Sequence, residues 1–224
     1  MTKEIEVDKT TLNKRQLAAW AGMIAPALFV AVFTIEGWLR PGYDAFSMYI
    51  SALALGPRGW IQIVNFIVLG ILLLIFAWGI KAEFPTGKAA RGGPIILIIL
   101  GILFIISGIF VMDPVETLPD QMSVHGLIHG IAGGIVFVSM PIAIFIFLRR
   151  FRVDANWQSL QGWTLGLGIV EATAVIIYSI ISKVPTLFNS FADWIGLIQR
   201  TALVPFMIWL FIFALHLYRL SKQE

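Results

Sequence analysis

Six long apolar runs, separated by short polar segments, dominate the pattern of the chain. Each run is long enough to cross a hydrocarbon core of ~30 Å, which takes about 20 helical residues. Lipid offers no partner to backbone N–H and C=O groups, so each run is predicted to be a helix. The sequence therefore predicts an all-α membrane protein, a bundle of six transmembrane helices at residues 17–39, 60–80, 94–112, 124–148, 160–182 and 192–218.

The ends of the chain are polar and short. We expect a polar tail at 1–16, a single six-helix transmembrane domain at 17–219 and a second tail at 220–224. The first apolar run lacks a small-residue cleavage site, which indicates a retained helix and not a cleaved signal peptide.

The distribution of lysine and arginine predicts the orientation. Cytoplasmic segments of membrane proteins carry an excess of these residues. With the N-terminus inside, the outer loops hold only Arg40, Arg58 and Lys183, and both termini are cytoplasmic. The inner segments then hold Lys3, Lys9, Lys14, Arg15, Lys81, Lys88, Arg91, Arg149, Arg150, Arg152, Arg219 and Lys222. We expect a multi-pass protein of the cell membrane.

The first outer loop, residues 40–59, is unusually apolar. Its middle, AFSMYISALALG, is too apolar for a solvated loop and too short to span a membrane. We predict a short interfacial or re-entrant helix there, over the outer end of the bundle.

Composition agrees with a membrane protein and excludes some chemistry. Hydrophobic residues make up 58% of the chain and charged residues 13%, whereas a soluble domain has about 25% charged residues. Cysteine is absent, so disulfides, thiolate metal sites and cysteine nucleophiles are excluded. The basic residues follow membrane topology, so no nucleic-acid partner is expected.

Residues 113–134 combine small and polar residues between two apolar runs. His125 and His129 are four residues apart, which places both imidazoles on one helical face. A stripe of glycines, at Gly126, Gly130 and Gly134, repeats at the same spacing beside them. Such stripes let helices approach closely in membranes, so we expect this segment to pack tightly against a neighbour.

The predicted topology gathers polar residues near the outer end of every helix. Ionisable residues within a membrane are costly unless they are paired, so they indicate a site or a salt bridge. The set is Glu36, Gln62, Asn65, Asp113, His125, His129, Tyr178, Ser179, Gln199 and Arg200. Glu36 and Arg200 are candidates for an ion pair with each other. Glu171 lies apart, near the middle of the fifth helix, as a protonated carboxyl bonded to a neighbouring helix or as a proton relay.

The histidine pair also suggests a metal. Two helical histidines at this spacing can share one zinc, and a zinc site needs at least a third protein ligand. Asp113 or Glu36 are the acids that would supply it. No other cofactor is expected, and zinc is the only one that the pattern leaves open.

The chain resembles the domain-of-unknown-function 998 family of six-helix prokaryotic membrane proteins. The resemblance rests on the loop SMYISALALGPRGWIQIVNF at 47–66, the Asp-Pro pair at 113–114 and VHGLIHG at 124–130. It covers nearly the whole chain, and the family implies no established activity.

Two looser likenesses bear on function. The DRAM and FRAG-type six-helix families are similar in their YIS-containing outer loop, and several members act in lipid-anchor handling or membrane regulation, which favours lipids. The matching residues here are Tyr49, Ile50, Ser51, Pro57, Asn65 and His125. The CREST intramembrane hydrolases resemble the chain in an intramembrane HxxxH with Asp and Ser, but they have seven helices and a third histidine.

Three functions are consistent with these observations. The preferred one is a protein whose outward-facing polar pocket binds a lipid headgroup or a small amphiphile, with membrane lipids as partners. The pocket would be lined by Glu36, Tyr49, Ser51, Asn65, Asp113, His125, His129 and Arg200. The second is a metal-dependent intramembrane lipid hydrolase using His125, His129 and Asp113. The third is a small transporter in which Glu171 couples to protons. Homo-oligomerisation is left open.

Overall fold

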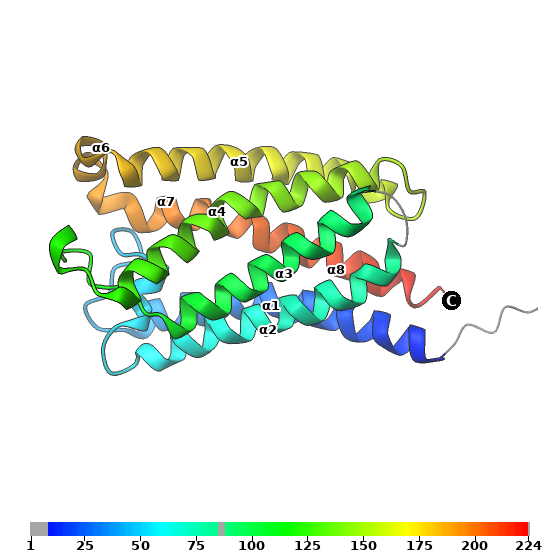
Figure 1. Ribbon diagram of the computed structural model, residues 1–224, viewed down its shortest axis with the longest axis horizontal. Coiled ribbons are helices and arrows are strands. Elements are labelled where there is room, and N and C mark those ends of the chain that lie inside the picture. The colour runs from blue at the N-terminus through cyan, green and yellow to red at the C-terminus, as the bar shows by residue number, and fades with distance from the viewer. Residues whose placement is uncertain (1–8, 85–87, 224) are drawn as a thin grey trace, which may run out of the picture.

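The computed structural model describes residues 9–84 and 88–223, without the side chains of 9–13, 88–91 and 119 (Figure 1). Helices and their connections make up all of this part of the chain, with no strand in it, as the sequence predicts. The long helices are α1 (Lys9–Leu39), α2 (Gly59–Glu83), α3 (Lys88–Ile109), α4 (Val124–Phe151), α5 (Gln161–Lys183) and α8 (Val204–Leu220). The short ones are α6 (Pro185–Ser190), α7 (Ile195–Thr201) and the 3-10 turns η1 (Ile50–Ala54), η2 (Pro119–Gln121), η3 (Gln158–Leu160) and η4 (Ala192–Trp194).

Six segments are long and apolar enough to cross a membrane, so the predicted number of spans is confirmed in the described residues. Five of them correspond to one long α-helix each. The sixth, Ala192–Leu220, differs from the single helix that the hydropathy predicts. It is broken into α7 and α8 at Ala202 and Leu203, just before Pro205, which has no N–H to continue a helix. By contrast, Pro26 and Pro141 lie inside unbroken helices.

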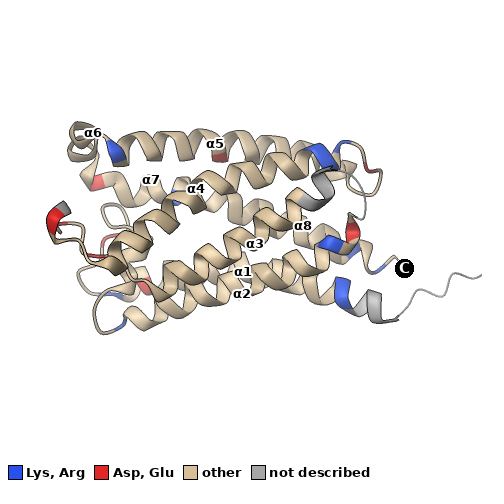
Figure 2. Ribbon diagram, viewed as in Figure 1, with Lys and Arg blue, Asp and Glu red and all other residues tan. Residues whose placement is uncertain are grey.

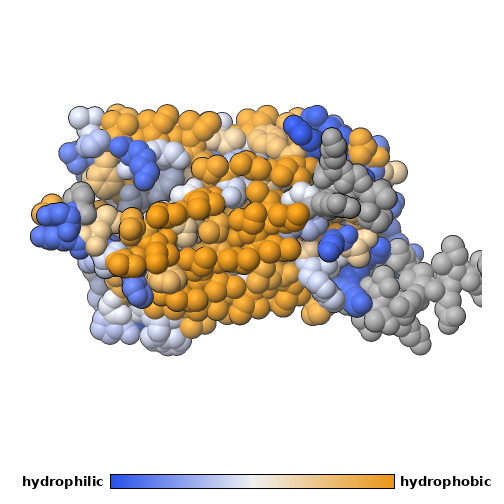
Figure 3. All heavy atoms as spheres, in the orientation of Figure 1, coloured by the Kyte–Doolittle hydropathy of each residue, from blue (hydrophilic) through white to orange (hydrophobic). Residues whose placement is uncertain are grey.

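The helices run along one axis, and consecutive long helices point in opposite directions (Figure 1). Each packs on its neighbour in the chain from α1 to α5, and α8 closes the bundle by contacting α5 and α1. The first described residues and the C-terminus lie at the same end (Figure 1). Charged residues gather at the two ends (Figure 2), and an apolar band covers the middle of the visible face (Figure 3). This is the surface that a bilayer requires.

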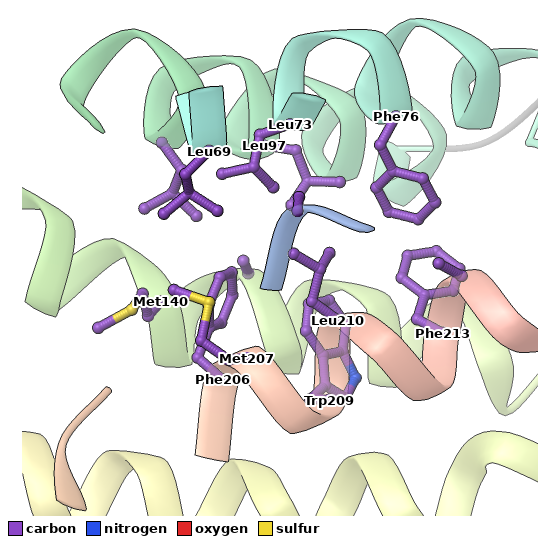
Figure 4. Packing of buried hydrophobic residues seen from close by; sticks show 14 of the residues in the cluster. Leu69, Leu73, Phe76, Leu97, Met140, Phe206, Met207, Trp209, Leu210 and Phe213 are labelled. Atoms are coloured by element: carbon purple, nitrogen blue, oxygen red, sulfur yellow. The ribbon is translucent and has the colours of Figure 1, made fainter. Parts of the chain in front are cut away.

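The core lies where α8 faces α2 (Figure 4). Leu69, Leu73 and Phe76 of α2 are buried, and their spacing places them on one face. They meet a facing row on α8, where the Phe76 and Phe213 rings pack edge to face with centroids 5.1 Å apart. In lipid, tight van der Waals packing of this kind holds helices together, since lipid tails are as apolar as the side chains.

The first outer loop contains a short helical segment where the sequence predicts one. It is the single 3-10 turn η1, and all five of its residues are buried. The turn contacts α1, α2 and α7, so it covers the end of the bundle opposite to the C-terminus, which is the predicted outer end. Its depth in a membrane, whether interfacial or re-entrant, stays a prediction.

The orientation of the bundle is directly testable because the chain has no cysteine. Thr117 lies in the loop before η2, and exposed Ala155 lies in the loop before η3, at the opposite end. With the N-terminus cytoplasmic, Thr117→Cys should react with a membrane-impermeant maleimide on intact cells, and Ala155→Cys should react only after lysis. The opposite labelling pattern would invert the proposed orientation.

Candidate functional site

Asp113 stabilises the N-terminus of helix α4. Its carboxylate accepts hydrogen bonds from the Ser123 N–H at 2.8 Å and the Ser123 hydroxyl at 2.7 Å. Ser123 is the N-cap of α4 and accepts from the N–H of Gly126 at 3.0 Å. A negative charge at a helix N-terminus is favourable because unpaired N–H groups point toward it. Asp113 therefore stabilises the turn between α3 and α4.

Gly126 makes this arrangement sterically feasible. A Cβ at this position would lie 2.0 Å from Oδ2 of Asp113, far inside van der Waals contact. By contrast, a Cβ added at Gly130 or Gly134 would meet nothing within 4 Å. The predicted close helix approach along this glycine stripe is thus wrong at Gly130 and Gly134, and Gly126 makes room for a carboxylate.

His129 caps the other helix of the same turn. Its Nδ1 lies 2.8 Å from the carbonyl oxygen of Phe110 and 3.1 Å from that of Ser107. Both neighbours are acceptors, so Nδ1 carries the proton and donates to them. Carbonyls at a helix C-terminus lack helical partners, and His129 satisfies two of them. Asp113 and His129 thus cap α4 and α3 reciprocally.

His125 lies apart from these bonds. It is exposed, and its ring packs on Phe110 with centroids 5.1 Å apart. No group of three His, Asp or Glu residues that would hold a metal occurs in the described part of the chain. The predicted ligand set of His125, His129 and Asp113 is therefore not assembled in this conformation, and neither is the hydrolase site that depends on it.

Glu36 binds two arginines. The side chain is 4% exposed, and its carboxylate accepts from Arg40 at 3.1 and 3.2 Å and from Arg58 at 2.9 and 2.5 Å. Arg40 also donates to the carbonyl of Leu55 at 2.9 Å. The Glu36 carboxylate raises the pKa of Arg58, chiefly through their hydrogen bonds. This cluster fastens both ends of the first outer loop to α1.

Arg200 fastens the middle of the loop. Its Nη1 donates to the carbonyls of Ala45 at 2.7 Å, Met48 at 3.1 Å and Gly196 at 2.8 Å, and Nη2 donates to the Tyr43 hydroxyl. The predicted Glu36–Arg200 ion pair is therefore wrong, because each group has other partners. The loop supplies carbonyl oxygens to Arg200 and arginines to Glu36, which the pattern of spans alone does not reveal.

Other loop contacts strengthen this attachment. Gln199 accepts from the N–H of Ile50 at 2.7 Å, and the N–H of Leu197 donates to Phe46 at 3.0 Å. A Cβ at Gly196 would lie 2.3 Å from the Met48 carbonyl oxygen, so only glycine lets α7 lie this close. The loop is thus bound directly to the backbone of α7.

The titratable groups of the loop are held in fixed charge states. Burial raises the pKa of Tyr49 to about 12 and raises that of Tyr43. Hydrogen bonds from the Ser47 hydroxyl and the Phe46 N–H hold the pKa of Asp44 below its usual value. Both phenols therefore stay neutral near neutral pH, and Tyr43 donates to the carbonyls of Met48 and Tyr49 at 3.3 and 3.1 Å.

Of the remaining predicted ligand residues, Asn65 and Ser51 are buried and Tyr49 is half-buried. Asn65 donates to the Phe29 carbonyl at 3.1 Å and to Gln62 at 3.2 Å. Ser51 lies in η1, and the Tyr49 ring packs on Tyr178 with centroids 6.5 Å apart. The structure thus distributes the predicted residues over the loop attachment, the α3–α4 turn and the interior, where most of their polar atoms bind other parts of the chain.

Two open grooves lie on the described surface, and the sequence pattern predicts neither of them. The smaller, of about 450 Å³, is lined by Ser159, Gly162, Trp163, Gly166 and Leu167, and the larger lies on α4. It has a volume of about 570 Å³ and runs along α4 beside the outer end of α5. Its floor is the exposed face of α4 at Gly130 and Gly134, and the other lining residues are Met122, Leu127, Ile131, Ile135, Val138 and Lys183. The repeat of glycines along α4 is visible in the sequence. That this face is left uncovered depends on the separation of α4 from α5 at this end of the bundle (Figure 1).

Comparison with known proteins gives one match. Residues 23–216 match the family model described as "Protein of unknown function (DUF998)". The match includes Glu36, Asp113, His129, Glu171 and Arg200. No curated protein and no solved structure matches the chain.

Proposed function

The chain belongs to the DUF998 family of proteins of unknown function, and we propose from its surface that it binds an anionic membrane lipid in the groove beside α4. The acyl chain would lie along the glycine floor, and the lipid phosphate would bind Lys183. The proposal keeps the lipid ligand that the sequence favours and moves its site from the polar pocket to the groove. A volume of about 570 Å³ is within the range of ~300–1,000 Å³ for small-molecule sites.

The length of the groove supports an acyl chain as its occupant. Lining residues on α4 extend from Leu127 to Val138, which is about 16 Å at 1.5 Å per residue. That is roughly half of a ~30 Å hydrocarbon core, the depth of one leaflet. The lining is apolar except at Lys183, so it suits hydrocarbon along its length.

Lys183 supports an anionic headgroup. It ends α5 at the same end of the bundle where Met122 precedes α4. In the described residues its ammonium group has no carboxylate within ion-pair distance. A lysine at this level attracts lipid phosphate, with about 1 kcal/mol per residue near the membrane surface. With the N-terminus cytoplasmic, the lipid belongs to the outer leaflet of the cell membrane.

We predict that Lys183→Gln weakens binding of phosphatidylglycerol by about fivefold, the equivalent of about 1 kcal/mol. Binding of phosphatidylcholine with the same acyl chains should change less, since its headgroup is zwitterionic. Native mass spectrometry of the purified protein, titrated with each lipid, measures both. Lys81→Gln, an exposed lysine at the opposite end, is the matched control.

The groove itself is tested by filling it. Gly134→Leu places a side chain on the groove floor and should reduce binding of both lipids. Thr173→Leu adds bulk at an exposed position of α5 outside the groove lining, and should leave binding unchanged. Equal binding by the Gly134→Leu variant and the parent protein would refute the groove as the lipid site.

A further inference from the structure

The sixth span is interrupted between α7 and α8, and the buried side chain of Glu171 forms a hydrogen bond with the chain just after this break. Glu171 is the only acidic residue of α5 and lies midway along it (Figure 2). The side chain is fully buried, and Oε2 accepts from the N–H of Phe206 at 3.1 Å. Phe206 is in the first turn of α8, two residues after the helix begins. Glu171 thus supplies the acceptor that a continuous helix would have supplied from Ala202.

The second oxygen of Glu171 has no partner. Oε1 is buried and makes no hydrogen bond in the described structure. A buried polar atom without a partner is costly, and such atoms in native proteins call for a specific explanation. The cap on α8 accounts for the burial of Oε2, but it does not account for the burial of Oε1 without a hydrogen bond.

No cation neutralises this carboxylate in the described part of the chain. Four charged or titratable side chains of the helices that contact α5 have partners elsewhere. His129 donates to α3 and Arg150 pairs with Asp154. Arg200 binds the outer loop, and His216 contacts the Asn156 carbonyl. His125 and Arg149 lie at the two ends of α4, Tyr218 and Arg219 lie near the C-terminal end of α8, and α6 and η3 carry no titratable side chain. On α5 itself, Tyr178 and Lys183 are about 10 and 18 Å along the helix from Glu171.

We propose that Glu171 is an internal proton-binding site, and that proton uptake there changes the joint between α7 and α8. In the ionised state the carboxylate accepts from the Phe206 N–H at the positive end of α8. On protonation, one oxygen gains an O–H and becomes a donor, and the other becomes a weaker acceptor. The break contains an acceptor of the kind that such an O–H needs. It is the carbonyl oxygen of Thr201, which cannot accept from residue 205 as in a continuous helix because Pro205 has no N–H.

The joint is built to respond to such a change. Only Ala202 and Leu203 separate the two helices. Both helices contact α5, but α7 is also attached to the outer loop through Arg200 and Gln199, whereas α8 also packs on α1 and α4. The two halves of the span therefore share α5 and differ in their other neighbours. Discontinuous membrane helices recur at substrate and ion sites of transporters, and acids inside a membrane recur in proton relays.

Infrared spectroscopy tests proton binding on the full-length protein in lipid nanodiscs. Between about pH 6 and pH 9, where exposed Asp and Glu side chains stay ionised because their pKa values are about 4, the parent protein should show a carboxylic C=O band that Glu171→Gln lacks. Glutamine keeps the size of the side chain and an acceptor for Phe206, but it does not titrate. Glu116→Gln, in an exposed loop, is the control and should retain the band. A band that persists in Glu171→Gln, or that is absent from the parent protein, overturns the proposal.

Spin labels test the coupled motion. Leu197→Cys and Phe211→Cys are exposed positions on α7 and α8, on either side of the joint. The distance between nitroxides attached there, measured by pulsed electron paramagnetic resonance, should change with pH and become constant when Glu171→Gln is added. A distance that does not change with pH in the otherwise unmodified chain overturns the coupling even if the glutamine variant fails to fold.

Discussion

Replacing Gly126 with alanine is expected to destabilise the protein by about 2–3 kcal/mol, because the new methyl group overlaps Asp113 and breaks the cap of α4. The Cβ would lie 2.0 Å from Oδ2 and 3.1 Å from the backbone nitrogen of Asp113. The backbone is close as well as the side chain, so a rotation of the carboxylate alone does not remove the overlap. Unfolding titration with SDS in mixed micelles measures the loss.

Gly133→Ala is the matched control for this prediction. It lies on the same helix, two turns further on, and a Cβ there would meet nothing within 4 Å. Alanine is a better helix former than glycine by up to about 1 kcal/mol, so this change should be neutral or stabilising. Similar losses for Gly126→Ala and Gly133→Ala would show that helix geometry, and not the room for Asp113, explains the effect.

Glu36→Gln is expected to destabilise the protein by about 2–3 kcal/mol, at or below the lower end of the ~3–5 kcal/mol typical of breaking a buried ion pair. Glutamine leaves the guanidinium of Arg40, whose side chain is 13% exposed, without its carboxylate. Arg58 is 49% exposed and regains water, which is why we expect the lower value. The free energy of unfolding in mixed micelles is again the measurement.

Double substitutions identify the partners of Glu36. Adding Arg40→Gln to Glu36→Gln removes the stranded charge and should recover part of the loss, since residues in contact couple by about 0.5–3 kcal/mol. Adding Arg200→Gln should give additive losses, because Arg200 binds the loop carbonyls. Recovery with Arg200→Gln instead would mean that Glu36 and Arg200 are partners after all.

The histidine and aspartate pattern between α3 and α4 illustrates how one sequence motif supports several explanations. His125, His129 and Asp113 are residue types that bind zinc, and their spacing permits it. The same residues also satisfy unpaired backbone groups where two helices meet at a turn. The distances favour capping, because His129 and Asp113 each bind atoms of the turn itself.

The sequence alone determined the class of fold and the number of spans. Runs of apolar residues specify helices in lipid because the backbone has no other partner there, and length then fixes how many cross the bilayer. The distribution of lysine and arginine groups the connections into two sets, and the structure places these sets at opposite ends of the bundle. The apolar segment of the first outer loop contains only the 3-10 turn η1, and the interfacial or re-entrant helix stays a prediction. These features depend on local composition and are readable residue by residue.

Only the tertiary structure decided which polar groups meet. Glu36 lies four residues from Arg40 but binds Arg58 as well, and Arg200 binds loop carbonyls more than 150 positions earlier in the chain. Backbone carbonyls are present at every residue, so no side-chain pattern marks the ones that accept. At the break before Pro205, the N–H of Phe206 likewise finds its acceptor in Glu171, on another helix, and not in the backbone. Hydropathy predicts that such residues need partners, but the partners themselves are set by how the helices pack.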